Sequence, residues 1–120
     1  MKISDEVKQF VAESPVKMVA TASKDGKPSV SAKGSLAIFD DGHLVFADIR
    51  SPGTIANLNE NAKIAIMCFN PETRHGCRIW GRAEVLNSGE VFDQVAEKWT
   101  NSNRKVNHIV KVAVDEMVTF

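Results

Sequence analysis

Apolar residues near the N-terminus recur at helical intervals, with capping and helix-breaking residues at the two ends of the pattern. The positions on one helical face are Ile3, Val7, Phe10 and Val11. Ser4 is a good N-cap, and the acidic residues that follow it suit the first helical turn. Pro15 cannot continue a helix, so the pattern predicts one helix between Ser4 and Pro15.

Short runs of small, β-branched and apolar residues then alternate with turns that contain glycine. Asp25-Gly26 and Asp41-Gly42 are typical of turns that join two antiparallel strands. Gly34 favours a bend or a bulge between two further strands. The strands predicted in this half of the chain cover residues 17–23, 28–33, 35–39 and 43–48.

The second half of the chain predicts two more helices and three more strands. Ser51-Pro52 is typical of a helix start, because serine caps and proline fits the first helical position. The apolar run over residues 62–69 indicates a strand buried on both faces or in the wall of a barrel. Ser88 is expected to cap a helix whose apolar side includes Trp99. The other predicted strands cover residues 77–86 and 108–114.

Taken in order, these elements are antiparallel strands linked by hairpins, with three short helices between them. Such an order favours a mainly β (α+β) fold in which an antiparallel barrel has its gaps covered by the helices. A chain of 120 residues has the size of one domain, so we expect residues 1–120 to fold as a single unit.

Charge and hydropathy exclude several classes of protein. The chain has 15 basic and 15 acidic residues, so it lacks the basic excess of a general nucleic-acid-binding protein. Its apolar runs are far shorter than the ~20 residues of a membrane-spanning helix, and no signal peptide is visible. We therefore expect a cytoplasmic protein that binds neither nucleic acid nor membrane. Cys68 and Cys77 are expected to be buried thiols in that reducing compartment.

The segment from Asp48 to Leu58 carries the clearest chemistry, because it follows a strand and opens a helix. A helix N-terminus presents unpaired N–H groups and partial positive charge, which suits phosphate. Arg50 adds a planar set of donors, and Ser51 and Thr54 add hydroxyl groups. Gly53 lets an anion approach the backbone. The alternative interpretation is a capped surface helix beside an ordinary arginine.

The chain resembles the small FMN-binding proteins of the pyridoxamine 5′-phosphate oxidase-like split-barrel superfamily. The resemblance covers nearly the whole chain and rests on the order and spacing of several segments. They are residues 18–22 with the Asp25-Gly26 turn, residues 28–36, residues 51–64 and residues 79–84. The resemblance implies an antiparallel split β-barrel that binds FMN and works as a homodimer with the flavin at the subunit interface.

The resemblance also implies roles for individual residues. Ser31, Ala32 and Lys33 would meet the flavin ring or the ribityl chain, and Asp48 and Ile49 would flank the ring. The residues that would hold the phosphate are Arg50, Ser51, Gly53 and Thr54. Many relatives have a basic residue where this chain has Gly53, so Arg50 would supply the charge from three residues earlier. Trp99 and Phe120 are the candidates for reaching the partner's flavin.

Several other residues are interpreted as structural. His43, His75 and His108 lack metal-ligand spacing, so we expect solvated histidines and no metal site. Trp80 is expected to pack in the barrel. Trp99 and Phe120 also have structural alternatives, in which Trp99 fills its own protomer's core and Phe120 is frayed.

The resemblance favours an FMN-dependent oxidoreductase or an electron-transfer flavoprotein with an unknown small-molecule or protein redox partner. A flavin supplies its own redox chemistry, so we identify no catalytic residue. Three alternatives share the barrel: a non-catalytic FMN store, a haem-binding relative and an enzyme that reduces a deazaflavin. A haem protein would need an axial ligand from the histidines or cysteines.

Overall fold

Helix α1 (Asp5–Glu13) forms where its apolar spacing predicts, in a computed structural model that describes residues 1–101 and 103–120. Ser4 caps it, since the Ser4 hydroxyl accepts a hydrogen bond from the Val7 N–H at 3.2 Å. The other helices are α2 (Pro52–Glu60) and α3 (Glu90–Trp99). The strands are β1 (Val16–Ala22), β2 (Pro28–Ala32), β3 (Ala37–Asp40), β4 (His43–Asp48), β5 (Lys63–Asn70), β6 (His75–Leu86) and β7 (His108–Thr119).

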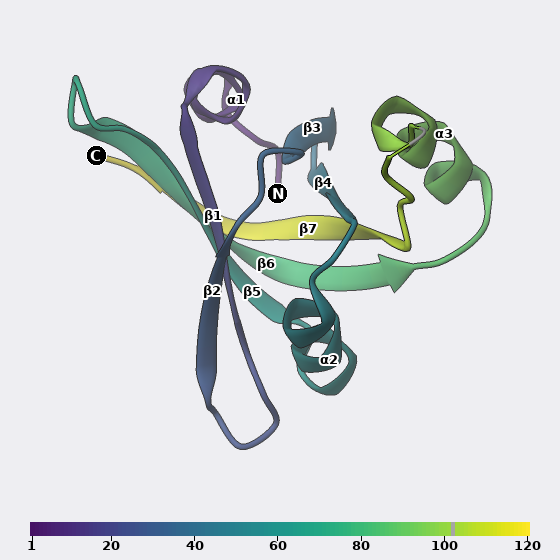
Figure 1. Ribbon diagram of the computed structural model, residues 1–120. Helices are drawn as coiled ribbons and strands as arrows, with labels where there is room; N and C mark the ends of the chain where they lie inside the picture. Colours follow the sequence, from purple (N-terminus) through teal and green to yellow (C-terminus); the bar gives the residue numbers. More distant parts are fainter. Residues whose placement is uncertain (102) are drawn as a thin grey trace.

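All seven strands belong to one antiparallel sheet with the order β2-β1-β5-β6-β7-β4-β3. The two edge strands, β2 and β3, follow each other in the chain and are joined only by residues 33–36. The sheet must therefore curl so that this short connection can span its two edges, and Figure 1 shows the loop that runs from β2 to β3. This is the mainly β barrel with covering helices that the sequence predicts.

The final strand is longer than predicted. It was expected over residues 108–114 but continues to Thr119, because β7 pairs with β6 on both sides of a register shift at Trp80/Gly81. Gly81 permits that pairing, since a Cβ atom there would lie 2.2 Å from the Ala113 carbonyl oxygen. The pairing of β6 and β7 beyond the shift ends in a reciprocal pair of hydrogen bonds between the backbones of Gly76 and Phe120.

Helix α3 starts differently from the prediction. Ser88 was expected to cap it, but the N-cap is Gly89, whose φ of 102° suits glycine, and no side chain caps the helix. Its buried residues, Val95 and Ala96, pack in a second cluster with β4 and the start of β7. The main core lies inside the barrel and includes Phe46, which is fully buried.

Two residue-level predictions concern the barrel wall. Trp80 was expected inside, but it lies on the outer face and is 37 % exposed, because β6 alternates and Ile79 takes the inward position. Strand β5 alternates in the same way, so it is a wall strand rather than one buried on both faces. Cys68 and Cys77 are free and fully buried, as predicted.

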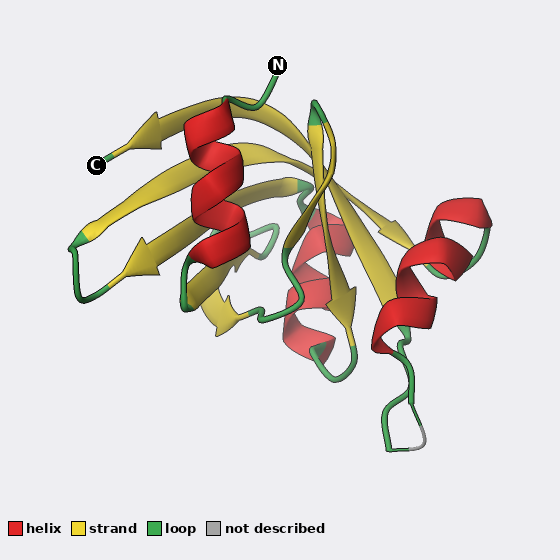
Figure 2. Cartoon of the chain, turned by 90° about the horizontal axis from the view of Figure 1, so that it is seen from above, coloured by secondary structure: helices red, strands yellow, loops and turns green. Residues whose placement is uncertain are grey.

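The elements divide between two ends of the molecule. Helix α1, the β5–β6 turn and the C-terminus lie at one end, and α2 and α3 lie at the other (Figures 1 and 2). Within residues 1–101 and 103–120, no helix is long and apolar enough to span a membrane.

Candidate functional site

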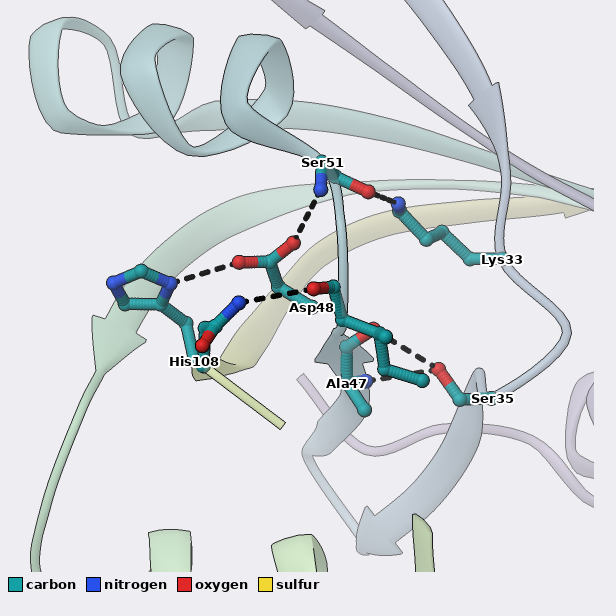
Figure 3. Close-up of polar contacts among 8 residues, drawn as sticks. Lys33, Ser35, Ala47, Asp48, Ser51 and His108 are labelled. Carbon is teal, nitrogen blue, oxygen red and sulfur yellow. Dashed lines mark hydrogen bonds and ion pairs between the residues drawn. The ribbon is translucent and has the colours of Figure 1, made fainter. Parts of the chain in front are cut away.

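Residues 48–51 run from the last residue of β4 to the start of α2, and hydrogen bonds hold them from both sides. We call this segment the strap. The Asp48 side chain is almost fully buried. Its Oδ1 accepts a hydrogen bond from the Ser51 N–H at 2.7 Å, and its Oδ2 lies 2.8 Å from His108 Nδ1 (Figure 3). The Asn107 side-chain amide donates to the Ile49 carbonyl oxygen at 2.9 Å. A buried carboxylate with partners on both oxygens fixes the shape of the strap.

Lys33 reaches the strap from the connection between β2 and β3. Its Nζ donates a hydrogen bond to Ser51 Oγ, and Figure 3 shows the side chain pointing at the strap. The residue is only 7 % exposed. Burial lowers the pKa of Lys33 from its ordinary value, and the nearby negative charge of Asp48 partly offsets this effect. An anion beside Lys33 would therefore gain from pairing with a poorly hydrated ammonium group.

Helix α2 begins at the end of the strap without a side-chain cap. Ser51 occupies the predicted N-cap position, but its hydroxyl is engaged with Lys33 and does not cap the helix. The hydrogen bond from the Ile55 N–H to the Ser51 carbonyl, at 3.1 Å, starts the helical ladder. The N–H groups of Gly53 and Thr54 precede that bond, and the first turn has no acidic residue. A Cβ atom on Gly53 would meet nothing within 4 Å, so space is open beside these donors.

Two side-chain contacts fix the start of α2 against the sheet. Ser31 Oγ on β2 lies 3.3 Å from Thr54 Oγ1, and Thr54 is buried. The Asn57 side-chain amide donates to Thr21 Oγ1 on β1 at 3.0 Å. A small cavity of about 230 Å³ lies beside this contact, between the start of β2 and the Gly53–Asn57 side of the helix. The helix start is thus held beside the strand that the resemblance assigns to the flavin.

A cavity of about 300 Å³ opens between the β2–β3 connection, the strap and the end of α3. We call it the cationic cavity, and its lining residues are Ala32, Lys33, Gly34, Ser35, Ala47, Ile49, Arg50, Ser51, Trp99 and Arg104. Three of these residues carry positive charge, and none of the described lining residues is Asp or Glu. This composition favours an anionic ligand, and Trp99 adds an aromatic surface.

The cationic cavity brings together residues that are far apart in the sequence. Arg104 was not predicted, because it lies in a polar connection that carries no motif. A tight turn positions it, since the backbones of Asn101 and Arg104 exchange hydrogen bonds of 3.0 and 3.2 Å.

His108 was predicted to be solvated, and its pairing with Asp48 gives it a structural role instead. A second cavity, of about 690 Å³, lies on the other side of the strap and is lined by His108 and several asparagines.

The sequence profile of the pyridoxamine 5′-phosphate oxidase family matches residues 3–118. The chain belongs to this family. It is also 31 % identical over 100 residues to an uncharacterized protein of Methanocaldococcus jannaschii. That alignment covers 82 % of this chain and 65 % of the archaeal protein, so the chain spans less than two thirds of its relative.

Solved structures show the same family fold. HupZ of Group A Streptococcus is 25 % identical, with a TM-score of 0.88 over 98 % of this chain and 94 % of HupZ. An FMN-binding protein of Syntrophomonas wolfei is 17 % identical, with a TM-score of 0.85 over 96 % and 84 % of the two chains. The heme storage protein HutZ of Vibrio cholerae is 18 % identical, with a TM-score of 0.72 over 100 % and 94 %. These matches confirm the predicted split barrel, whose members include FMN-binding and haem-storing proteins.

The structure places ten of the eleven predicted site residues of this family member at one end of the barrel. Six line the cationic cavity: Ala32, Lys33, Ile49, Arg50, Ser51 and Trp99. Four lie next to it, in the strap, on β2 and at the start of α2: Ser31, Asp48, Gly53 and Thr54. Phe120 is the exception, since it lines a different cavity together with α1. Phe120 and Trp99 therefore line two different cavities of this chain.

The donor set at this end of the barrel fits FMN. A phosphate needs positive charge and N–H donors, which Arg50 and the first turn of α2 offer. The open space at Gly53 lets a phosphate reach the backbone. A flavin ring needs a partly apolar wall, which Ile49, Ala32 and Trp99 offer.

Proposed function

We propose that this protein binds FMN in the cationic cavity, with the phosphate at the start of α2, and works as an FMN-dependent oxidoreductase or electron-transfer protein. The observation that carries the proposal is the convergence of Lys33, Arg50 and Arg104 on one cavity whose described lining has no carboxylate. The strap holds this arrangement in place through the buried Asp48. Family membership supports the same choice of ligand.

FMN would supply the electron-transfer chemistry, and the chain's own residues would bind and orient it. The Gly53 and Thr54 N–H groups and the Arg50 guanidinium would hold the phosphate. Lys33 would place a positive charge beside the ligand and stabilise negative charge on the reduced ring. These residues bind and orient the ligand, and none of them is proposed to transfer a proton.

A homodimer is part of the proposal. The outer face of β2, β1, β5 and β6 has an apolar cavity of about 370 Å³ lined mainly by Met18, Ala20, Val30, Ala65, Met67 and Trp80. Val30 is 63 % exposed in the single chain, and exposed apolar patches of this kind mark interfaces. A two-fold dimer would cover the patch and bring a partner's aromatic residue toward the flavin. Light scattering should give twice the 13.2 kDa chain mass, and Trp80→Glu should give a monomer.

The cofactor assignment is tested first on the purified protein. Ligand released by denaturation should have the mass of FMN and the absorption of an oxidised flavin near ~450 nm, a property of the cofactor. A haem spectrum would overturn the proposal in favour of the haem-binding alternative. The mass of a deazaflavin would show that the cofactor is a deazaflavin rather than FMN. If the bound FMN exchanges electrons with no donor or acceptor, the protein is a non-catalytic FMN store.

The phosphate position is tested with Arg50→Ala and two ligands. Loss of a charge-assisted contact costs about 1.5 kcal/mol or more, so FMN affinity should fall about tenfold or more. Riboflavin affinity should fall much less, since riboflavin has no phosphate. Lys98→Ala is the control, because Lys98 is exposed on α3 and does not line the cavity. Equal losses for FMN and riboflavin would contradict this position.

A further inference from the structure

The end of the barrel opposite the cationic cavity holds another cavity, of about 460 Å³. It lies between α1, the β5–β6 turn and the last residue of the chain. We call it the acidic cavity, and its lining residues are Glu6, Phe10, Glu13, Ser14, Asn70, Thr73, His75 and Phe120. Two of the described lining residues are acidic, and none is Lys or Arg. Its charge is thus opposite to that of the proposed FMN site.

One stripe of α1 provides the charged wall. Glu6, Phe10 and Glu13 follow one another at helical spacing, so their side chains share a face next to the buried Val7 and Val11. The phenyl ring of Phe10 therefore stands between two carboxylates. Such a surface is complementary to a group that is positively charged and attached to apolar carbon.

The opposite wall includes Phe120, which several contacts hold in place. Its ring centroid lies 6.0 Å from that of Phe69, and the Arg78 guanidinium lies 5.0 Å from the ring centroid. Gly76 makes room for the ring, because a Cβ atom there would lie 3.1 Å from it and 2.2 Å from the Cys68 carbonyl oxygen. The Phe120 ring is thus a fixed apolar surface rather than a frayed end.

Ser14, at the end of α1, is an independent sign of a ligand. It lines the acidic cavity and is 7 % exposed. Its N–H donates to the Phe10 carbonyl at 3.0 Å, but its buried hydroxyl has no hydrogen-bond partner among the described residues. A buried hydroxyl without a partner is destabilising, so native proteins usually satisfy it. A polar group of a ligand would do so here.

We propose that the acidic cavity binds a small organic cation, an ammonium or guanidinium group carried on a short apolar body. The carboxylates of Glu6 and Glu13 pair with the cation, Phe10 and Phe120 contact the apolar body, and Ser14 supplies a hydrogen bond. This site is separate from the cationic cavity and does not depend on FMN.

The probe is phenethylamine, which joins an ammonium group to one aromatic ring. Titration of the ¹⁵N-labelled protein should shift amide signals at the end of α1 and in the β5–β6 turn, with a Kd of about 0.1–1 mM for a ligand of this size. The neutral analogue 2-phenylethanol should bind at least about threefold more weakly. Equal affinity for the alcohol, or no binding of the amine below about 10 mM, would overturn the proposal.

Conservative variants test the carboxylates. Glu6→Gln and Glu13→Gln should each weaken phenethylamine about two- to fivefold, and they should leave 2-phenylethanol unchanged. Glu97→Gln is the matched control, because Glu97 is exposed on α3 and distant from this cavity. An equal loss in Glu97→Gln would show a general charge effect and would contradict a built site.

Ser14→Ala distinguishes a ligand-binding role from a structural one. The variant should bind phenethylamine about fivefold more weakly, while its melting temperature stays equal or rises, since a buried hydroxyl without a partner is removed. A structural serine would give the opposite result, with a lower melting temperature and unchanged amine affinity. These measurements need no bound FMN, so the failure of either proposal can be told from the failure of the other.

Discussion

The two ends of this barrel carry cavities of opposite charge that are built in different ways. The cationic cavity joins a strand connection, the strap and the segment after α3, and it depends on buried polar groups. The acidic cavity is lined largely by one stripe of α1 and one hairpin, and both of its carboxylates belong to exposed residues. A net charge of zero therefore hides two cavities whose described linings have opposite charge.

The two cavities differ in the polar contacts that lie behind them. Lys33, Ser51, Asp48 and His108 form a continuous chain of polar contacts behind the cationic cavity. Behind the acidic cavity lie apolar side chains and the Ser14 hydroxyl, which has no hydrogen-bond partner among residues 1–101 and 103–120. A buried, satisfied network fixes a geometry that a cofactor needs, whereas exposed carboxylates tolerate ligands of varied shape.

The largest expected effect comes from removing the carboxylate at the centre of the strap. Asp48→Ala leaves the Ser51 N–H and His108 without their acceptor, so the free energy of unfolding should fall by about 3 kcal/mol. Asp115→Ala is the control, because Asp115 pairs with Arg82 in an exposed contact at 3.2 Å and should cost less than about 1 kcal/mol. Urea denaturation measures both values. Similar losses in the two variants would show that the strap network is not a special source of rigidity.

The next effect separates binding from stability at Lys33. Lys33→Met should weaken FMN and riboflavin alike, by about 1.5–3 kcal/mol or about 10- to 100-fold, because Lys33 is proposed to lie beside the ring that both ligands carry. The ligand-free variant should be more stable than the wild type, because burial of the ammonium group is unfavourable. Glu13→Gln, at the other cavity, should leave FMN affinity unchanged.

The pH dependence of that stability difference has a defined sign. The pKa of Lys33 is lowered by burial, so the unfolded chain binds more protons than the folded chain at pH values between the lowered pKa and the ordinary 10.5. The destabilisation caused by burying the charged Lys33 side chain is complete below the lowered pKa. It disappears as pH rises through that window. The wild type should therefore approach Lys33→Met in stability at alkaline pH, and a constant difference would contradict the assignment.

Phe120→Ala is the change expected to affect both cavities. In its own protomer it should weaken phenethylamine by about 1 kcal/mol, since an aromatic contact is lost. In the proposed dimer it should also loosen FMN, because the resemblance places the partner's C-terminus beside the flavin. If FMN affinity is unchanged while amine affinity falls, Phe120 belongs to the acidic cavity alone.

The smallest expected effect is on the flavin potential. Lys33→Glu should lower the potential of bound FMN by an amount on the order of 20 mV, because negative charge near the ring disfavours its reduced anion. Lys98→Glu, on the exposed face of α3, should leave the potential unchanged. An unchanged potential in Lys33→Glu with intact binding would mean that Lys33 does not face the ring.

Most of the local structure follows from patterns in the sequence. The apolar spacing after Ser4, the Asp25-Gly26 turn and Pro52 mark elements that the structure contains within a few residues of their predicted bounds. Helix caps were less predictable. Ser51 and Ser88 have the right chemistry to cap α2 and α3, but in one case tertiary contacts engage the serine and in the other Gly89 takes its place.

The tertiary structure decided which charges meet. Chain order places Lys33, Arg50 and Arg104 far apart, and only the curled sheet brings them to one cavity. The same curling sends Trp80 outward and pairs His108 with Asp48 across 60 residues, because sheet register depends on distant partners. Local sequence patterns reflect the conformational preferences of neighbouring residues, whereas a cavity is lined by residues that only the folded barrel brings together. For that reason residues 48–51 could be singled out from the sequence, whereas the contacts that hold them and the acidic cavity at the other end could not.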